Sequence, residues 1–355
     1  MDKKNKNPNV PNLRFLKFNQ NYETLQLKNT LKIKSGKDQK QVEVENGIYN
    51  IYGTGGIIGH TNTFLYDKES VGIGRKGTID KPVYFDQPFW TVDTLFYSEI
   101  YEGFIPKYIF YLFQTINWKK YNTSTGVPSL TSSSIENIEK SFPCYDEQLK
   151  VANFLTMIDM RIETQIKIID SYFSLSKAIS NTLIGQSKGN TRLRECLNCY
   201  SSNTMESVIK QEDLGDYPVY GANGIIKKIN NYEIEYPSIA IVKDGSGVGK
   251  IFKLSGKYSI LSTLNYLTSK PGYDIDYIYY ALKQKSLKKY VVGSGIPHIY
   301  FKDYEQEKIY IPQNELQQHN ITSVLQSIDE EIGNEIKQLK NYELLKKYLL
   351  KNMFV

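Results

Sequence analysis

The stretch that decides the fold lies between Tyr217 and Gly249. It reads Tyr-Pro-Val-Tyr-Gly-Ala-Asn-Gly-Ile-Ile over 217–226, then Ile-Ala-Ile-Val over 239–242, then Lys-Asp-Gly-Ser-Gly-Val-Gly over 243–249. An earlier copy begins with Tyr-Asn-Ile-Tyr-Gly-Thr-Gly-Gly-Ile-Ile at 49–58 and continues with Val-Gly-Ile-Gly-Arg-Lys-Gly-Thr at 71–78. Tyr52 matches Tyr220 and Arg75 matches Lys243 at one constant separation, so the same module occurs twice.

The repeat extends far beyond these motifs. Later matches pair Tyr121, Gly126, Pro128 and Pro143 with Tyr290, Gly295, Pro297 and Pro312, and Ile158, Ile162, Ile166 and Tyr172 with Ile328, Ile332, Ile336 and Tyr342. Solenoid repeats are about 20–50 residues long, and this period is several times longer. The pattern therefore predicts the tandem duplication of a whole domain together with the segment that follows it.

Each copy has the pattern of an α+β globule. In the first, we expect strands at 24–33, 48–52, 64–66, 71–73, 83–85 and 90–97, a helix over 105–120, a loop at 126–131 and a last strand over 135–142. The second copy repeats this plan, with its helix at 276–290 and its loop at 295–299. The domains predicted are a disordered tail at 1–12 and globules at 13–145 and 188–312.

A long helix is expected after each globule, at 146–187 and 313–355. Apolar residues recur there every three or four positions without an interrupting proline, from Val151 to Leu183 and from Ile321 to Met353. Two such seams in one chain predict an antiparallel coiled-coil pair. The alternative is that each helix packs only on its own globule as an ordinary core helix.

Several motifs do not fit enzyme or metal sites. Gly72–Gly77 matches the dinucleotide-binding spacing, but a strand rather than a helix follows it, and the second copy lacks the spacing. Cys196 and Cys199 have no partner pair for zinc, and they align with Thr30 and Ile33, which we expect in a strand. His60, His298 and His319 occupy unrelated positions. We expect no catalytic residues, no metal site and no bound cofactor.

Composition limits the remaining classes. The chain of 355 residues carries a net charge of +6 and 29 tyrosines, a mild basic excess that is compatible with a polyanionic partner. No apolar run approaches the roughly 18 residues that a membrane span needs, and the basic N-terminus has no signal-peptide pattern. We therefore expect a cytoplasmic protein that does not bind membranes.

Basic residues beside glycines are the remaining candidates. Arg75, Lys76, Lys243 and Lys250 lie on glycine turns, where the backbone can approach a partner closely. Arginine can bind guanine and lysine can neutralise phosphate, although a single turn of this kind is usually only a solvated hairpin tip. A basic residue at the same place in both copies favours a function.

In these repeated motifs the chain resembles the specificity (S) subunit of type I restriction–modification systems. The resemblance covers nearly everything after residue 12 and rests on motifs that occur in one order, twice. These are Pro-Asn-Leu-Arg-Phe at 11–15, the Tyr-Gly-x-x-Gly-Ile-Ile element, the glycine turns, the Gly-x-Pro loops, and Phe-Pro or Ile-Pro before each long helix at 142 and 311. The first copy departs by lacking the proline before its Tyr-Gly, and Lys243 stands where the first copy has Arg75.

The resemblance implies two target-recognition domains joined by two long helices. Each domain would read one half of a split double-stranded DNA target, and the helices would set the gap and dock two methyltransferase (M) subunits. Those subunits would carry S-adenosylmethionine and methylate adenine, and restriction-translocase (R) subunits would join the complex. The chain itself would be non-catalytic.

The resemblance also places the candidate DNA contacts on the glycine turns, the hairpins and the Gly-x-Pro loops. These candidates are Tyr52, His60, Arg75, Lys76, Thr78, Ser129 and Thr131 in the first copy, and Tyr220, Asn223, Lys227, Lys243, Ser246, Lys250, His298 and Tyr300 in the second. Two other functions remain open: a non-catalytic coiled-coil scaffold that binds a ligand but no DNA, and a nucleotide-dependent enzyme.

Overall fold

The computed structural model describes residues 9–209 and 215–355, which divide into two compact units. The first unit contains the chain up to residue 166 together with residues 337–355, and the second contains residues 167–336. The predicted tail at 1–12 overlaps the described residues only at 9–12. There the Tyr22 N–H donates to the Asn9 carbonyl and Pro11 is buried, so Asn9 and Pro11 contact the first unit.

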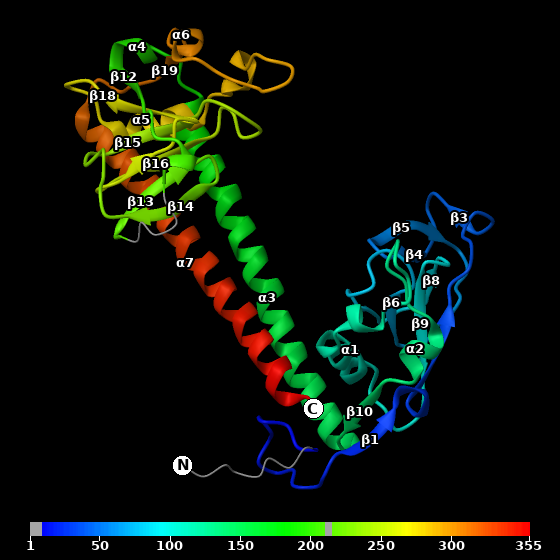
Figure 1. The fold of residues 1–355 in the computed structure, drawn as a ribbon. Coiled ribbons are helices and arrows are strands. Elements are labelled where there is room, and N and C mark those ends of the chain that lie inside the picture. Colours follow the sequence, from blue (N-terminus) through cyan, green and yellow to red (C-terminus); the bar gives the residue numbers. More distant parts are fainter. Residues whose placement is uncertain (1–8, 210–214) are drawn as a thin grey trace, which may run out of the picture. The chain divides into compact units, whose positions relative to one another are not determined.

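The first unit is built on two four-stranded sheets (Figure 1). One sheet has the order β2-β9-β6-β7, and the other has the order β3-β5-β4-β8. Strands β1 and β10 form a separate antiparallel pair. The strands are β1 Glu23–Gln26, β2 Leu31–Ser35, β3 Glu43–Val44, β4 Tyr49–Gly53, β5 Gly56–Thr61, β6 Ser70–Gly74, β7 Val83–Phe85, β8 Phe89–Thr91, β9 Leu95–Ile100 and β10 Glu139–Phe142.

The second unit repeats this topology. Its sheets have the orders β12-β18-β15-β16 and β14-β13-β17, and β11 pairs with β19. The parallel pairing of β4 with β8 recurs as β13 with β17, and the register shift before Tyr52 recurs before Tyr220. The strands are β11 Thr191–Arg192, β12 Leu197–Ser201, β13 Tyr217–Gly221, β14 Gly224–Ile229, β15 Ser238–Val242, β16 Ile251–Leu254, β17 Ser259–Ile260, β18 Leu264–Ser269 and β19 Lys308–Ile309. The duplication predicted from the sequence is therefore confirmed.

Helices cover one side of each core. In the first unit these helices are α1 (Pro106–Thr115), α2 (Ser132–Glu136) and the beginning of α3 (Tyr145–Ser180). The second has α4 (Leu193–Cys196), α5 (Ile275–Lys283), α6 (Phe301–Tyr304) and the start of α7 (Glu315–Met353). Helix α1 is amphipathic and buries five side chains, from Tyr108 to Phe113, against the sheet. Burial of each large apolar side chain contributes roughly 1.5–3 kcal/mol, so these helices hold the cores together.

The two long helices run antiparallel, as predicted. Near the start of α3, Val151 and Leu155 share a core with Leu349 and Met353 near the end of α7. In the second unit, the end of α3 at Ile179 packs with the start of α7 at Ile321 and Leu325. Each helix also packs on the globule that precedes it, but not on that globule alone, so the alternative of an ordinary core helix for each globule is wrong. The seams are not buried throughout, because Ile166, Leu175 and Ile336 are exposed.

Equivalent side-chain hydrogen bonds attach the long helix to the globule in both copies. The Tyr111 hydroxyl donates to Asp159 of α3 at 2.8 Å, and the Tyr280 hydroxyl donates to Asp329 of α7 at 2.9 Å. The first unit also contains a bidentate ion pair between Arg14 and the buried Glu147. Arg14 Nε lies 2.8 Å from Glu147 Oε1, and Arg14 Nη2 lies 2.7 Å from Glu147 Oε2. The chain segment before β1 is thereby fixed to the beginning of α3.

Some expected elements were wrong in type or length. The strand expected over 24–33 is interrupted by a 3-10 turn at Leu27–Asn29, and residues 64–66 make only an isolated bridge, Tyr66 to Phe89. The run at 90–97 is two strands, β8 and β9. The last strand expected over 135–142 begins only at Glu139, because Thr131 caps the short helix α2 before it.

The helices expected at 105–120 and 276–290 each end early, and a separate 3-10 turn follows at Trp118–Tyr121 and at Leu287–Tyr290. In the first copy the Trp118 indole N–H donates to the Phe113 carbonyl at 2.9 Å, which satisfies one of the carbonyls left open at the helix end. Cys196 was also misplaced, since it ends the single helical turn α4, whereas Cys199 lies in β12 as expected for a strand position.

Candidate nucleic-acid interface

Two loops of the first unit are joined by main-chain hydrogen bonds. The Gly77 N–H donates to the Pro128 carbonyl and the Leu130 N–H donates to the Arg75 carbonyl, both at 2.9 Å. Gly77 has a φ of +86°, a conformation that favours glycine. The glycine turn after β6 and the Gly-x-Pro loop before α2, which are far apart in sequence, therefore form one rigid edge.

This edge borders a cleft of about 350 Å³. The cleft is lined by Ser35, Arg75, Lys76, Phe96, Ser129, Leu130, Thr131 and Ser132. Four of the seven residues that the sequence proposed for the first copy thus lie together. A cleft with two cationic side chains and several hydroxyl groups has the chemistry that phosphate and base edges require.

Two contacts hold the Arg75 side chain in position. Its guanidinium lies 5.9 Å from the centre of the Phe96 ring, and Nη1 donates to the Asp93 carbonyl at 3.3 Å. A guanidinium has five N–H donors, so most remain available to a ligand. Lys76 is exposed. The Thr131 hydroxyl, in contrast, accepts the Ser134 N–H at 3.1 Å as the α2 cap, which gives it a structural role.

The second unit contains the same paired loops. The Gly245 N–H donates to the Pro297 carbonyl and the Ile299 N–H donates to the Lys243 carbonyl, again both at 2.9 Å, and Gly245 has a φ of +93°. His298 and Tyr300 lie on the Gly-x-Pro loop with ring centres 5.1 Å apart. The structure therefore brings Lys243 and His298 to one edge, with Tyr300 next to His298.

Other candidates lie elsewhere. The Tyr52 ring packs 4.9 Å from Phe85, and the Tyr220 ring packs 6.0 Å from Tyr258, so both contribute to small cores. His60 is exposed on β5 opposite Val44 of β3, and it does not line the cleft. Asn223 lies at the tip of the β13–β14 hairpin and Lys227 lies within β14, while Thr78, Ser246 and Lys250 follow the glycine turns. Their contacts with DNA stay predictions.

Asp244 was not among the residues predicted from the sequence. In the second copy it occupies the position that Lys76 has in the first. The isolated bridge from Lys76 to Ser129 recurs as the bridge from Asp244 to His298. The signal was present in the repeat itself, because aligning the two turns places an acidic residue opposite a basic one. Phe96, which forms part of the cleft lining, gave no signal because it is one apolar residue in a strand.

The three cysteines do not form a metal site in the described part of the chain. Burial raises the pKa of the Cys196 thiol to about 12 and that of Cys199 to about 11, so both stay protonated near neutral pH. Within residues 9–209 and 215–355, no group of three or more metal-ligating side chains occurs. Cys196 and Cys199 behave as small apolar residues of the second core, whereas Cys144 is exposed.

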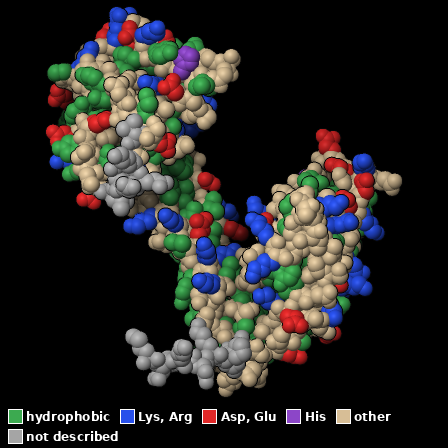
Figure 2. Space-filling view, in the orientation of Figure 1, with side chains coloured by type: hydrophobic (Ala, Val, Ile, Leu, Met, Phe, Trp, Pro, Cys, Tyr) green, Lys and Arg blue, Asp and Glu red, His purple; other side chains and the backbone are tan. Residues whose placement is uncertain are grey.

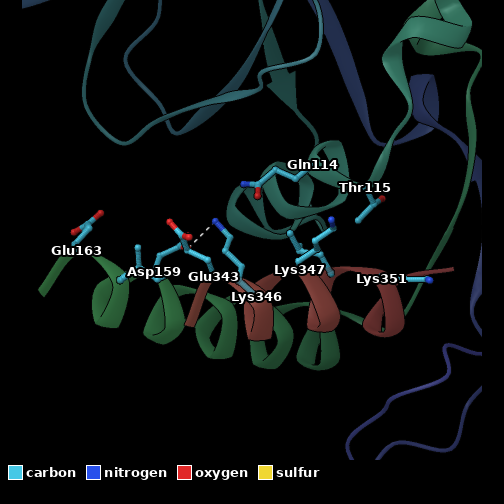
Figure 3. Close-up of a pocket in the computed structure, with 10 residues that line it drawn as sticks. Gln114, Thr115, Asp159, Glu163, Glu343, Lys346, Lys347 and Lys351 are labelled. Carbon is cyan, nitrogen blue, oxygen red and sulfur yellow. Dashed lines mark ion pairs between the residues drawn. The ribbon is translucent and has the colours of Figure 1, made fainter. Parts of the chain in front are cut away.

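A larger cleft of about 710 Å³ lies in the first unit, between the end of α1 and the two long helices. Figure 3 shows its polar side chains, with the Lys346 ammonium paired to Asp159 at 2.7 Å. The charged lining residues are Asp159, Glu163, Glu343, Lys346, Lys347 and Lys351. Three acidic groups balance three basic ones, so this cleft offers no net attraction to phosphate.

Overall charge does not identify the interface. Figure 2 shows Lys and Arg side chains scattered over the visible face of each unit and interspersed with Asp and Glu. The helices in the described ranges include none with the length and apolar character of a membrane span. The paired loops are therefore selected by their geometry, since they repeat in both units with equivalent main-chain hydrogen bonds around the candidate side chains.

Comparison with known proteins shows the family of the chain. The family described as "Type I restriction modification DNA specificity domain" matches residues 19–170 and again residues 191–341. The specificity subunit of the type I restriction enzyme MjaVIII from Methanocaldococcus jannaschii is 34% identical over 169 residues, which are 44% of this chain and 39% of that protein. The EcoprrI specificity subunit from Escherichia coli is 22% identical over 120 residues, or 34% of this chain and 30% of that one. The alignments thus span well under half of these relatives.

Solved structures show the same fold over almost the whole chain. The crystal structure of a type I restriction–modification S subunit from M. genitalium matches with a TM-score of 0.73 at 19% identity, covering 98% of this chain and 99% of that one. A structure reported for complex assembly and conformational transition of the type I system matches with a TM-score of 0.51 at 11% identity, covering 93% and 96%. The repeated topology, the twice-built loop pair and the two family matches together show that this chain belongs to the type I restriction–modification DNA specificity family, with one copy of its domain in each half.

Proposed function

We propose that this chain selects the DNA target of a type I restriction–modification complex, and that each unit reads one half of a bipartite double-stranded sequence. The observation that carries the proposal is the loop pair that each unit builds with two equivalent main-chain hydrogen bonds and with different side chains. A shared backbone gives both units the same way of approaching DNA. Different side chains give each unit its own sequence preference.

The side chains divide into two roles. Lys250 is exposed and follows the glycine turn, a position suited to neutralising phosphate. Arg75 is held against Phe96 with free donors and is suited to a bidentate contact with guanine. Of the candidates, Tyr52, Tyr220 and Thr131 act through packing and capping, so we assign base reading first to the turns at 75–78 and 243–246.

The chemistry would come from partner subunits. We infer that two methyltransferase subunits bind S-adenosylmethionine and methylate adenine, that restriction-translocase subunits join them, and that the complex works in the cytoplasm. Exposed apolar side chains on the long helices support a docking role. In the first unit Met157 and Met160 of α3 are 62% and 60% exposed, and Tyr348 of α7 is 57% exposed. Apolar surface of this kind marks interaction sites. The helices pass from one unit into the other and would set the gap between the half-sites.

The proposal is tested by binding. The chain is assembled with its methyltransferase, and affinity is measured for duplexes that carry or lack the target over a series of salt concentrations. Lys250→Ala should weaken binding to all duplexes alike and reduce the slope of log affinity against log salt by about 1. Lys28→Ala, at an exposed lysine on the 3-10 turn Leu27–Asn29 of the other unit, is the matched control. Binding that stays absent, or that ignores sequence and salt, would refute the proposal.

A further inference from the structure

The position occupied by Lys76 in the first unit and by Asp244 in the second is flanked by equivalent main-chain hydrogen bonds, although the Lys76 N–H itself also donates to the Thr94 carbonyl at 3.2 Å. On one side the Arg75 N–H donates to Thr94 at 2.8 Å, and the Lys243 N–H donates to Thr263 at 2.9 Å. On the other side Gly77 and Gly245 donate to Pro128 and Pro297. Because both flanking residues are fixed in the same way, the side chain of the central residue leaves the loop at an equivalent point in each unit.

The two central side chains have opposite charge. Lys76 is exposed, and Asp244 is half-buried beside His298. Asp-Gly pairs are common in turns, where the aspartate usually accepts an N–H from its own turn. The Asp244 carboxylate makes no such hydrogen bond and no ion pair within the described residues, and Asp244 caps no helix there. The local fold therefore does not explain why an acidic residue stands here.

A carboxylate at a DNA-facing loop has a restricted set of partners. Phosphate oxygens repel it, and so do the N7 and O6 acceptors of guanine. The groups that attract it are exocyclic amino groups, above all the N4 amino group of cytosine in the major groove. An ammonium group at the same place has the reverse preference and favours guanine. One backbone position can thus select opposite members of a base pair according to which residue it carries.

We propose that Asp244 is a base-reading residue that accepts a hydrogen bond from a cytosine amino group in the second half-site, and that Lys76 reads a guanine at the equivalent position of the first. This inference rests on the proposed function, because it requires that the paired loops face DNA. It goes further by naming the residue, the base and the groove, and by assigning the difference between the two half-sites to one position of the duplicated domain.

The test uses the complete complex in a host that lacks other adenine methylation. Methylated adenines are mapped by single-molecule sequencing for the wild type, Asp244→Asn, Asp244→Ala and Lys76→Asp. Asp244→Asn keeps the size of the side chain but can pair with both N6 and N7 of adenine. It should raise methylation of sites with adenine at one position of the second half-site by at least about fivefold relative to cytosine sites. Asp244→Ala should relax that position.

The first half-site is the internal control, and it should not change in the Asp244 variants. Lys76→Asp should alter one position of the first half-site and leave the second intact. An Asp244→Asn complex that methylates the wild-type motif with unchanged base preference overturns the inference while leaving the proposed function standing. If a variant loses all methylation, the affinity of the same complex for duplexes is measured. A folded variant complex whose affinity falls equally for every base at that position also overturns the inference. If no methylation motif depends on the wild-type chain, the proposed function itself fails.

Discussion

At the scale of single residues, the structure separates side chains that hold the loops from side chains that are free to read a ligand. Thr131 was a candidate contact, but its hydroxyl caps α2. Arg75 was also a candidate, and its contact with Phe96 orients the guanidinium while leaving donors available. The sequence supplies residue type and position, but it does not show which hydroxyl or charge is already engaged, because that depends on local backbone geometry at Thr131 and on the packing of Arg75 against Asp93 and Phe96.

Replacement of Arg75 by alanine should relax one position of the first half-site. A bidentate arginine–guanine contact contributes about 1–3 kcal/mol of discrimination, and alanine removes it. The measurement is the relative affinity of the assembled complex for duplexes that differ at each base in turn. Lys28→Ala should leave every preference unchanged. An Arg75→Ala complex with the wild-type pattern of preferences would remove Arg75 from the reading surface.

The cysteines should differ strongly in reactivity towards iodoacetamide at pH 8. Thiolate is the reactive form, and the raised pKa values of Cys196 (about 12) and Cys199 (about 11) keep both thiols protonated at this pH. Cys144 is exposed and should be labelled first. Peptide mass spectrometry of the native and urea-unfolded protein checks this order. Equal labelling of all three thiols in the native protein would contradict the burial described for β12 and α4.

At the scale of elements, long periodic patterns were the easiest to predict from sequence. The second long helix was expected over 313–355, and α7 spans Glu315–Met353. Short elements were missed for a physical reason. Helix α2 has only five residues and one buried side chain, so it depends on its Thr131 cap rather than on apolar periodicity. The strand at 64–66 failed because β propensity does not guarantee a pairing partner.

Two leucines on α7 provide a matched test of the helix packing. Leu349 is 4% exposed and lies in the core with Val151 and Leu155, whereas Leu344 is 55% exposed on the same helix. Leu349→Ala should reduce the free energy of unfolding of the first unit by about 2–5 kcal/mol, because it leaves a cavity. Leu344→Ala should change that free energy by less than about 0.5 kcal/mol. Urea unfolding followed by circular dichroism measures both, and equal effects would argue against the described pairing of α3 and α7.

At the scale of the whole molecule, the duplication explains both what the sequence predicted and what it left open. Repeated glycines, prolines and apolar seams preserve the fold of both copies, and the family and the paired helices were predicted from them. The loops, in contrast, share a backbone and differ in side chains, as at Lys76 and Asp244. A search for residues that recur in both copies therefore finds the framework of the site and misses the residues that make the two halves different.

The central claim is that this chain determines which DNA sequence its complex modifies, one half-site per unit. The most direct measurement is single-molecule sequencing of methylated adenines in host cells with the gene intact, deleted, and restored. We predict that one bipartite motif is methylated only when the gene is present, and that it returns on restoration. Identical methylation in all three strains would contradict the account.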